Sequence, residues 1–386
     1  MRYEQMNETL LALKEKHNLR VLPTFTHEGK YAIREGHRML NLSSNDYLGL
    51  STLPHLKEEF LAGMKPADLQ WSASSSRLLT GNFQAHRDLE ELLARLFHKE
   101  AALVFNSGFH ANSGIVAAIA DKRTLILADK LVHASLIDGI RLSGATCIRY
   151  KHNQYDQLES LLQERHDQYD SILLITESVF SMDGDKADLK RLCAIKKRYS
   201  NVLLYVDEAH AFGVFGPTGL GCAEEQECLN DIDLIVGTFG KAIASEGAFV
   251  VGRQVVRDYL INTMRPFIFT TALPPVNVQW TSFIVNKLES FGPYRKHLQA
   301  ISLQLRETLS GLGYSNQSES GIIPLTIGDS GACMRLAEAL QRKGFYVLPV
   351  RPPTVPAGTS RIRFSLTAAI TTTEIEQLKQ TLKEIL

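Results

Sequence analysis

Several features that mark particular classes of protein are missing from this sequence. Basic residues are not in excess, because Lys plus Arg and Asp plus Glu number 42 each, which argues against a nucleic-acid or anionic-membrane partner. No apolar run approaches the roughly 18 residues that a membrane span requires. The first residues also lack the apolar stretch of a secretory signal. We therefore expect a cytoplasmic protein.

Cysteine is scarce, and its spacing carries no pattern. The five cysteines are scattered, and no two of them form a CxxC pair. An odd, dispersed set argues against a disulfide framework and against a zinc site, so we expect buried thiols and no metal. The chain has no internal repeat or low-complexity segment. Its 386 residues, 44% hydrophobic and 22% charged, are typical of an ordinary globular protein long enough for two packed units.

Between residues 101 and 249, short apolar segments alternate with helical ones. Such alternation indicates βαβ units and a mostly parallel sheet, with room for one antiparallel member. Continuous apolar runs such as Val202–Val206 indicate strands that are buried on both faces. The sequence therefore predicts an α/β fold with helices on both faces of the sheet. The expected strands are Leu125–Leu127, Ile172–Thr176, Val202–Val206, Leu234–Gly237 and Ala248–Val251.

Two regions flank this large domain, which we expect to span residues 45–275. Residues 1–44 hold one amphipathic helix and a polar, irregular stretch, with too few apolar residues for a core of their own. Residues 276–386 predict a smaller α+β domain, opened by a long helical stretch from Val276 to Leu312. Its further elements are expected at Ile322–Ile327, Gly331–Lys343, Phe345–Val350 and Arg361–Leu366, with a last helix capped by Thr371 and Glu374.

A single lysine, Lys241, is set among small residues between Gly237 and Ala242, at the end of an expected strand. Burial disfavours the ammonium form and lowers the pKa of a lysine. A partly neutral amine is what Schiff-base chemistry requires. A surface lysine on an ordinary strand-to-helix turn would give the same local pattern, so this stretch alone does not decide between the two.

Asp207 and His210 follow the strand Val202–Val206. Because the carboxyl ends of parallel strands gather at one edge of a sheet, these residues and Lys241 should converge. A lysine, a carboxylate and an imidazole suit pyridoxal 5'-phosphate (PLP): they would bind its aldehyde, its ring nitrogen and its ring oxygen. Asp207 alone would be an ordinary helix N-cap.

A phosphate cradle is expected where a short apolar strand ends at Gly108. Gly108 and Phe109 open a helix, whose free N–H groups and dipole favour an anion. Thr238, three residues before Lys241, would add a hydroxyl. A strand–glycine–helix turn by itself is more often structural. His133 would lie on the face of the ring, or else be a structural histidine.

Taken together, these motifs resemble the α-oxoamine synthases, the fold type I PLP enzymes that join an amino acid to an acyl-CoA thioester. The segment Arg351–Thr359 is similar to that of the member that uses L-alanine and a pimeloyl thioester, on CoA or on a carrier protein. A relative that uses glycine and acetyl-CoA is the alternative. A non-catalytic PLP-binding regulator would need a DNA-binding module, which the chain lacks. The resemblance is carried by Ser44–Gly49, Ser107–Phe109, His133–Ser135, Phe180–Asp185, Asp207–His210 and Thr238–Lys241.

The resemblance implies roles for the matching residues. Lys241, His133, Asp207 and His210 would be catalytic, and Ser181 would contact the cofactor. Gly108, Phe109 and Thr238 would take the phosphate. The substrate residues would be Asn45 and Arg351, for the amino-acid carboxylate, with Arg20 and Thr354.

The resemblance also implies a homodimer, in which Thr270 or Thr271 reaches the phosphate site of the partner subunit. The chain departs from the family at Ser72, Ser74 and Ala244, where glycines are usual. These departures remove no group that performs chemistry, and we expect both to bear on the acyl pocket.

Overall fold

The computed structural model describes residues 2–386, which form two compact units. The larger unit comprises Leu53–Ser181 and Lys186–Arg295. The smaller unit comprises residues 2–52, 182–185 and 296–386. The expected limits at residues 44 and 275 do not coincide with these units. The first 44 residues are not a separate arm, because one of their strands pairs with a strand at Phe345.

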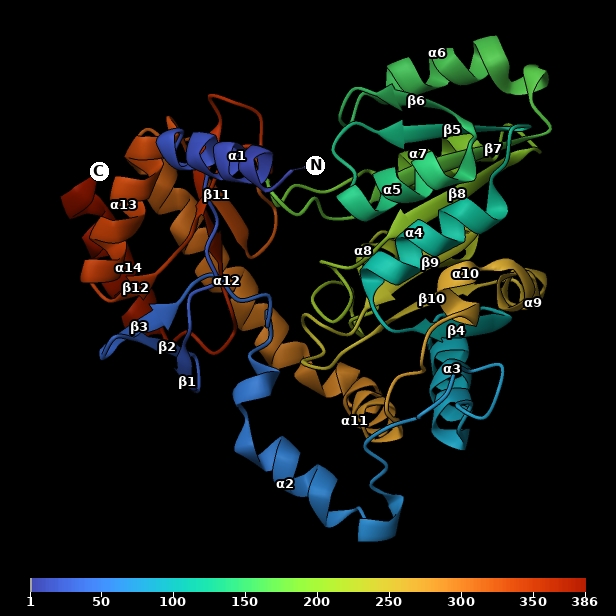
Figure 1. The fold of residues 1–386 in the computed structure, drawn as a ribbon, viewed down its shortest axis with the longest axis horizontal. Helices are drawn as coiled ribbons and strands as arrows, with labels where there is room; N and C mark the ends of the chain where they lie inside the picture. The colour runs from blue at the N-terminus through green and yellow to red at the C-terminus, as the bar shows by residue number, and fades with distance from the viewer. Residues whose placement is uncertain (1) are drawn as a thin grey trace. The chain divides into compact units, whose positions relative to one another are not determined.

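The larger unit is built on a seven-stranded sheet with the strand order β4-β10-β9-β8-β7-β5-β6 (Figure 1). Only β10 runs antiparallel to its neighbours, and the other pairs are parallel, as the sequence predicts. The edge strand β6 escaped prediction because it is only partly buried. The strands are β4 (Ala101–Phe105), β5 (Thr124–Asp129), β6 (Thr146–Tyr150), β7 (Ser171–Glu177), β8 (Val202–Asp207), β9 (Leu234–Thr238) and β10 (Ala248–Gly252).

Helices cover both faces of this sheet (Figure 1). In β7, Leu173 and Ile175 join a core cluster with Ile115 of α4, while Ile172 and Leu174, on the opposite face, are also fully buried. Burial on both faces is the reason that these strands are continuous apolar runs. The helices are α2 (Pro54–Ala62), α3 (Gln84–Leu96), α4 (Gly108–Ile119), α5 (Ala134–Ser143), α6 (Tyr155–Arg165), α7 (Leu189–Lys196), α8 (Cys222–Glu225), α9 (Gln254–Thr263), α10 (Arg265–Ile268) and α11 (Pro275–Asn286).

The smaller unit contains two small sheets, with the orders β1-β2-β3-β12 and β11-β14-β13. The strands of the first are β1 (Thr26–Glu28), β2 (Tyr31–Arg34), β3 (His37–Asn41) and β12 (Phe345–Tyr346), and those of the second are β11 (Ile322–Gly328), β13 (Pro349–Val350) and β14 (Ser360–Ser365). The helices are α1 (Tyr3–Glu15), α12 (Gly292–Gly311, whose first residues belong to the larger unit), α13 (Ser330–Arg342) and α14 (Thr372–Ile385).

Two expectations for the smaller unit are wrong. The stretch before Met39 is not irregular, because β1, β2 and β3 form a meander there. Its small core joins Ala32 and Met39 to Tyr346, a partner that no local pattern reveals. The segment Phe345–Val350 is not one strand but two, and each belongs to a different sheet.

Helix boundaries elsewhere follow the sequence closely. Thr371 and Glu374 form the expected capping box at the start of α14. The long helical stretch after Val276 is interrupted by a 3₁₀ turn at Leu288–Phe291, between α11 and α12. Within residues 2–386, no helix combines the length and the apolar character needed to cross a membrane.

Candidate active site

Lys241 lies three residues beyond the end of β9, and its side chain is half-buried. Its Nζ lies 3.0 Å from Nε2 of His210. His210 follows the end of β8, which is the parallel neighbour of β9. The lysine and the imidazole therefore meet at the carboxyl edge of adjacent strands, as expected from the sequence.

Asp207 is the last residue of β8, and only 4% of its surface is exposed. Its Oδ2 accepts a hydrogen bond of 2.7 Å from Nδ2 of Asn112, and its Oδ1 accepts one of 2.8 Å from the N–H of Ala209. These contacts hold the carboxylate in one orientation inside the site. A fixed, buried carboxylate is suited to pair with a protonated ring nitrogen.

His133 caps the N-terminus of α5, and its Nδ1 lies 2.8 Å from Oγ of Ser135. Burial lowers the pKa of His133, and the charge of Asp207 opposes this shift only in part. The ring is therefore neutral near pH 7. Ser135 is fully buried, and its role was not anticipated from the sequence.

The N-terminus of α4 supplies free backbone N–H groups at Gly108 and Phe109. A Cβ on Gly108 would lie 3.8 Å from Oγ1 of Thr238, so the threonine hydroxyl borders this helix end. Helix N-termini of this kind bind phosphate. The expected cradle is thus assembled from two separate strand ends.

These groups line one open cavity of about 210 Å³. A lysine amine, a fixed carboxylate, imidazoles and an anion-binding helix end fit the aldehyde, ring and phosphate of PLP. Ser181, also expected here, is not among the lining residues. The lining residues are Gly108, Phe109, Asn112, His133, Ser135, Glu177, Asp207, Ala209, His210, Thr238 and Lys241.

Glu177 is a lining residue that the sequence reasoning missed. It ends β7 and pairs in register with Asp207 of β8. Burial, and after it the charge of Asp207, raises the pKa of Glu177 well above its usual range. Its Oε1 has no hydrogen-bond partner among the described residues. A carboxylic residue at the end of a buried strand next to Asp207 was the available signal.

The expected substrate residues lie in the smaller unit. Nη2 of Arg20 donates a 2.7 Å hydrogen bond to Oγ1 of Thr354, so this predicted pair is brought together. Asn45 and Arg351 are not paired. Arg351 donates instead to the carbonyl oxygen of His17, at the end of α1, and contacts Sδ of Met334 in α13.

Arg363 of β14 occupies the position next to Asn45 that was expected for Arg351. Its Nη1 and Nη2 both lie 3.4 Å from Oδ1 of Asn45, and Nη2 lies 3.4 Å from the hydroxyl of Tyr47. The expected strand Arg361–Leu366 did contain this residue. A cation two residues into an otherwise buried strand was the signal that could have identified it.

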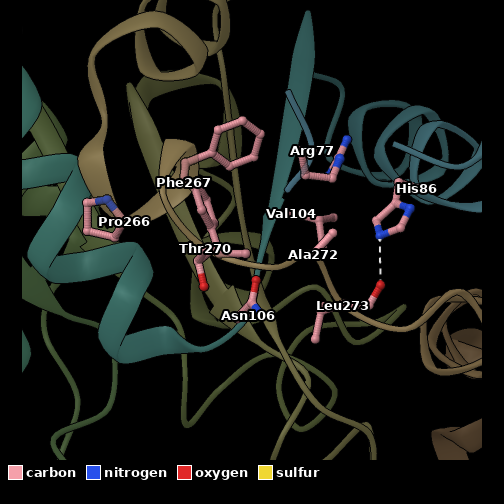
Figure 2. Close-up of a pocket in the computed structure, with 10 residues that line it drawn as sticks. Arg77, His86, Val104, Asn106, Pro266, Phe267, Thr270, Ala272 and Leu273 are labelled. Carbon is pink, nitrogen blue, oxygen red and sulfur yellow. Dashed lines mark hydrogen bonds between the residues drawn. The ribbon is translucent and has the colours of Figure 1, made fainter. Parts of the chain in front are cut away.

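Figure 2 shows residues that line a separate small pocket in the larger unit, among them Thr270 and His86. Burial, followed by the charge of Arg77, lowers the pKa of His86 to about 4, and its Nε2 bonds the carbonyl oxygen of Leu273. His86 is therefore a neutral, structural histidine. The expectation that Thr270 or Thr271 reaches a partner subunit stays a prediction.

Both loops that depart from the family pattern contain a residue in the left-handed region. Ser74 has φ +52° and Ala244 has φ +51°. Non-glycine residues adopt this conformation at a cost of roughly 1–2 kcal/mol. The glycines expected at these places would therefore suit the same backbone. The chain accepts this strain at Ser74 and at Ala244.

Comparison with known proteins identifies a protein family whose model matches this chain. The model of the family "aminotransferase class I and II" matches residues 37–382. A protein of Glaesserella parasuis serovar 5 (strain SH0165), provisionally named 8-amino-7-oxononanoate synthase, is 54% identical over 372 residues, which cover 96% of this chain and 98% of that protein.

Two solved structures are also similar along most of the chain. A serine palmitoyltransferase variant from S. paucimobilis, with PLP and myriocin bound, has a TM-score of 0.89 at 28% identity and covers 99% of this chain and 96% of its own. An 8-amino-7-oxononanoate synthase from Francisella tularensis has a TM-score of 0.75 at 31% identity, with coverage of 89% and 96%.

Proposed function

The chain belongs to the aminotransferase class I and II family, and on this premise we propose that it is a PLP-dependent acyltransferase of biotin biosynthesis. It condenses L-alanine with a pimeloyl thioester and yields 8-amino-7-oxononanoate, a free thiol and carbon dioxide. The similar proteins named for this product support the substrates. The convergence of Lys241, His210 and Asp207 on one cavity is the observation that carries the chemistry.

Each of the cavity residues would contact a different part of the cofactor. Lys241 would bind the aldehyde covalently, Asp207 would pair with the ring nitrogen, and His210 with the ring oxygen. His133 would cover the ring face, and the N–H groups at the start of α4 would hold the phosphate with Thr238. Ser181 remains a proposed polar contact. When bound, PLP supplies an electron sink for charge that develops on the Cα of the amino acid.

Lys241 is the group that moves protons in this scheme. Its Nζ, in the amine form, would accept the Cα proton of alanine and later return a proton to the same carbon. Between these transfers, Cα forms a bond to the thioester carbon, the C–S bond breaks to release the thiol, and the bond to the carboxylate breaks to release carbon dioxide. Nε2 of His210 lies 3.0 Å from this Nζ.

The alanine carboxylate is assigned to Asn45 and Arg363, in place of the Arg351 that the sequence favoured. A guanidinium beside an amide offers several N–H donors to one carboxylate. The contact between Arg363 and Asn45 supports this pair. Arg20 and Thr354 remain proposed substrate contacts.

The remaining proposals concern the setting of the enzyme. We expect a cytoplasmic homodimer in which Thr270 or Thr271 approaches the phosphate site of the partner subunit. Sedimentation analysis of the purified protein tests the dimer. No nucleic-acid partner is expected from the balanced charge.

Thiol release and mass spectrometry of the product test the proposed function. The purified enzyme is supplied with PLP and with alanine plus pimeloyl-CoA, or with glycine plus acetyl-CoA. We expect faster thiol release with the first pair and a product of the mass of 8-amino-7-oxononanoate. Preference for glycine and acetyl-CoA would contradict the assignment. A pimeloyl carrier-protein thioester, tested at equal concentration, identifies the preferred donor.

A further inference from the structure

A continuous chain of hydrogen bonds links Asp207 to His133 at the wall of the cavity, through Asn112 and Ser135, to which the scheme above assigns no part. The Tyr205 hydroxyl donates to Oδ1 of Asn112 over 2.7 Å. Nδ2 of Asn112 lies 2.7 Å from Oδ2 of Asp207 and 3.0 Å from Oγ of Ser135. Oγ of Ser135 then lies 2.8 Å from Nδ1 of His133. The chain thus joins the carboxylate on β8 to the imidazole at the start of α5.

The donors and acceptors in this chain have one consistent assignment. A carboxylate can only accept, so the NH₂ group of Asn112 faces Asp207, and the Tyr205 hydroxyl holds the amide in that orientation. The second hydrogen of this NH₂ group points to Oγ of Ser135. Ser135 Oγ already receives that hydrogen, so its own hydrogen is free to point to His133 Nδ1.

A second contact leads to the same conclusion. The backbone N–H of Ser135 donates to Nδ1 of His133 over 3.2 Å. A backbone N–H cannot reverse its direction, so a hydrogen on Nδ1 would leave the N–H of Ser135 without its acceptor. Nδ1 is therefore the acceptor nitrogen, and the hydrogen of the neutral ring sits on Nε2.

We propose that Asn112 and Ser135 are positioning residues that hold His133 as the neutral Nε2–H tautomer, so that it donates a hydrogen bond to an oxygen of the bound substrate. The substrate part of this inference rests on the proposed function. His133 lines the same cavity as Lys241, where its Nε2–H would be available to a carboxylate or thioester oxygen of the substrate. All three supporting side chains, of Asn112, Ser135 and Tyr205, are at most 2% exposed, so water does not compete for these bonds.

The groups around His133 act on its charge in opposite directions. Asp207, from β8, favours the protonated ring, and Lys241, beyond β9, disfavours it. Glu177, from β7, receives the backbone N–H of His133. Burial is the dominant influence and keeps the ring neutral, which agrees with two donors facing Nδ1.

Nitrogen-15 NMR of the histidine-labelled protein, with and without PLP, tests the tautomer directly. A His133→Gln variant identifies the signal among the 12 histidines. We expect wild-type His133 to show a bare Nδ1 and a protonated Nε2 at neutral pH. Ser135→Ala should give a mixture of tautomers and a higher His133 pKa, whereas Ser135→Thr, which keeps the hydroxyl, should resemble the wild type. A protonated Nδ1 in the wild type, or an unchanged spectrum in Ser135→Ala, would overturn the proposal.

Kinetics separate this proposal from the proposed function. Ser135→Ala should lower kcat about tenfold, the value of one hydrogen bond, with little change in KM for alanine. Ser143→Ala is the matched control, because its hydroxyl bonds only local backbone at the other end of α5. A wild-type spectrum as expected, without product from alanine and a pimeloyl thioester, would refute the proposed function and leave the tautomer assignment standing.

Discussion

The two units assemble their polar sites in different ways. In the larger unit, the functional groups emerge from the ends of neighbouring strands of one sheet, so Lys241, His210 and Asp207 meet because β8 and β9 are adjacent and parallel. In the smaller unit, Arg363 and Asn45 come from segments 318 residues apart. The first arrangement follows from a general rule of parallel sheets. The second depends on which distant segments happen to pair.

The largest effect on activity is expected at Lys241, which the general rule for parallel sheets places at the carboxyl edge. Lys241→Ala removes the amine that binds the cofactor and moves the protons, so product formation should fall on the order of 10⁴-fold or more. The visible absorbance of the enzyme–PLP linkage should vanish as well. Absorbance spectra and product assays measure both effects. A Lys241→Ala variant that kept its visible absorbance and its turnover would contradict the role assigned to this lysine in the larger unit.

The two arginines of the smaller unit provide the sharper comparison. Arg363→Ala should raise KM for alanine about 100-fold, because a hydrogen bond to a charged group contributes roughly 1.5–3 kcal/mol. Arg351→Ala, whose side chain contacts α1 and α13, should change the same KM by less than about threefold. Steady-state kinetics with varied alanine decide between them. The opposite ranking would restore the arginine that the sequence favoured.

Two carboxylates, one in each unit, give opposite dependences of stability on pH. In the larger unit, burial raises the pKa of Glu208 to about 7, although hydrogen bonds from Ser178, Ala223 and Cys222 oppose the shift. In the smaller unit, burial alone would raise the pKa of Glu374, but hydrogen bonds from Lys30, Tyr31 and Thr371 lower it to about 2.

The sign of each contribution follows from these directions. Glu208 contributes stability below its ordinary pKa of 4.5, and that stability is lost as pH rises through about 7. Glu374 contributes stability above 4.5, which is lost as pH falls through about 2. Melting temperatures measured across pH should therefore flatten on the neutral side in Glu208→Gln and on the acid side in Glu374→Gln. Identical profiles for the two variants would contradict this difference between the units.

The smallest effect concerns the strained turn after the lysine. Ala244→Gly should raise the free energy of unfolding by up to about 1 kcal/mol, because the relief of the left-handed conformation exceeds the entropy cost of glycine. Ala94→Gly, in the last turn of α3, is the control and should lower it by up to about 1 kcal/mol. Denaturant unfolding measures both. Destabilisation by Ala244→Gly would show that the turn carries no strain.

Much of the larger unit was readable from the sequence. The five expected strands and the cofactor groups follow from apolar runs and from polar residues at their ends, whereas the structure identified β10 as the antiparallel member. Glu177 and Asn112 were missed because a buried carboxylic acid and a buried amide look like ordinary polar residues in a sequence. Their roles depend on neighbours on another strand: Asp207 of β8 lies beside Glu177, and Tyr205 of β8 bonds Asn112.

The sequence by itself determined the chemistry of this protein, because each strand that ends in a polar residue delivers it to the same edge of a parallel sheet. Local order in the chain thus becomes proximity in space for Lys241, Asp207 and His210. The tertiary structure alone decided that Arg363 and not Arg351 accompanies Asn45, and that Ser135 sets the hydrogen on His133. Such contacts depend on side chains of distant segments meeting at hydrogen-bond distance, and neither periodicity nor composition encodes that distance.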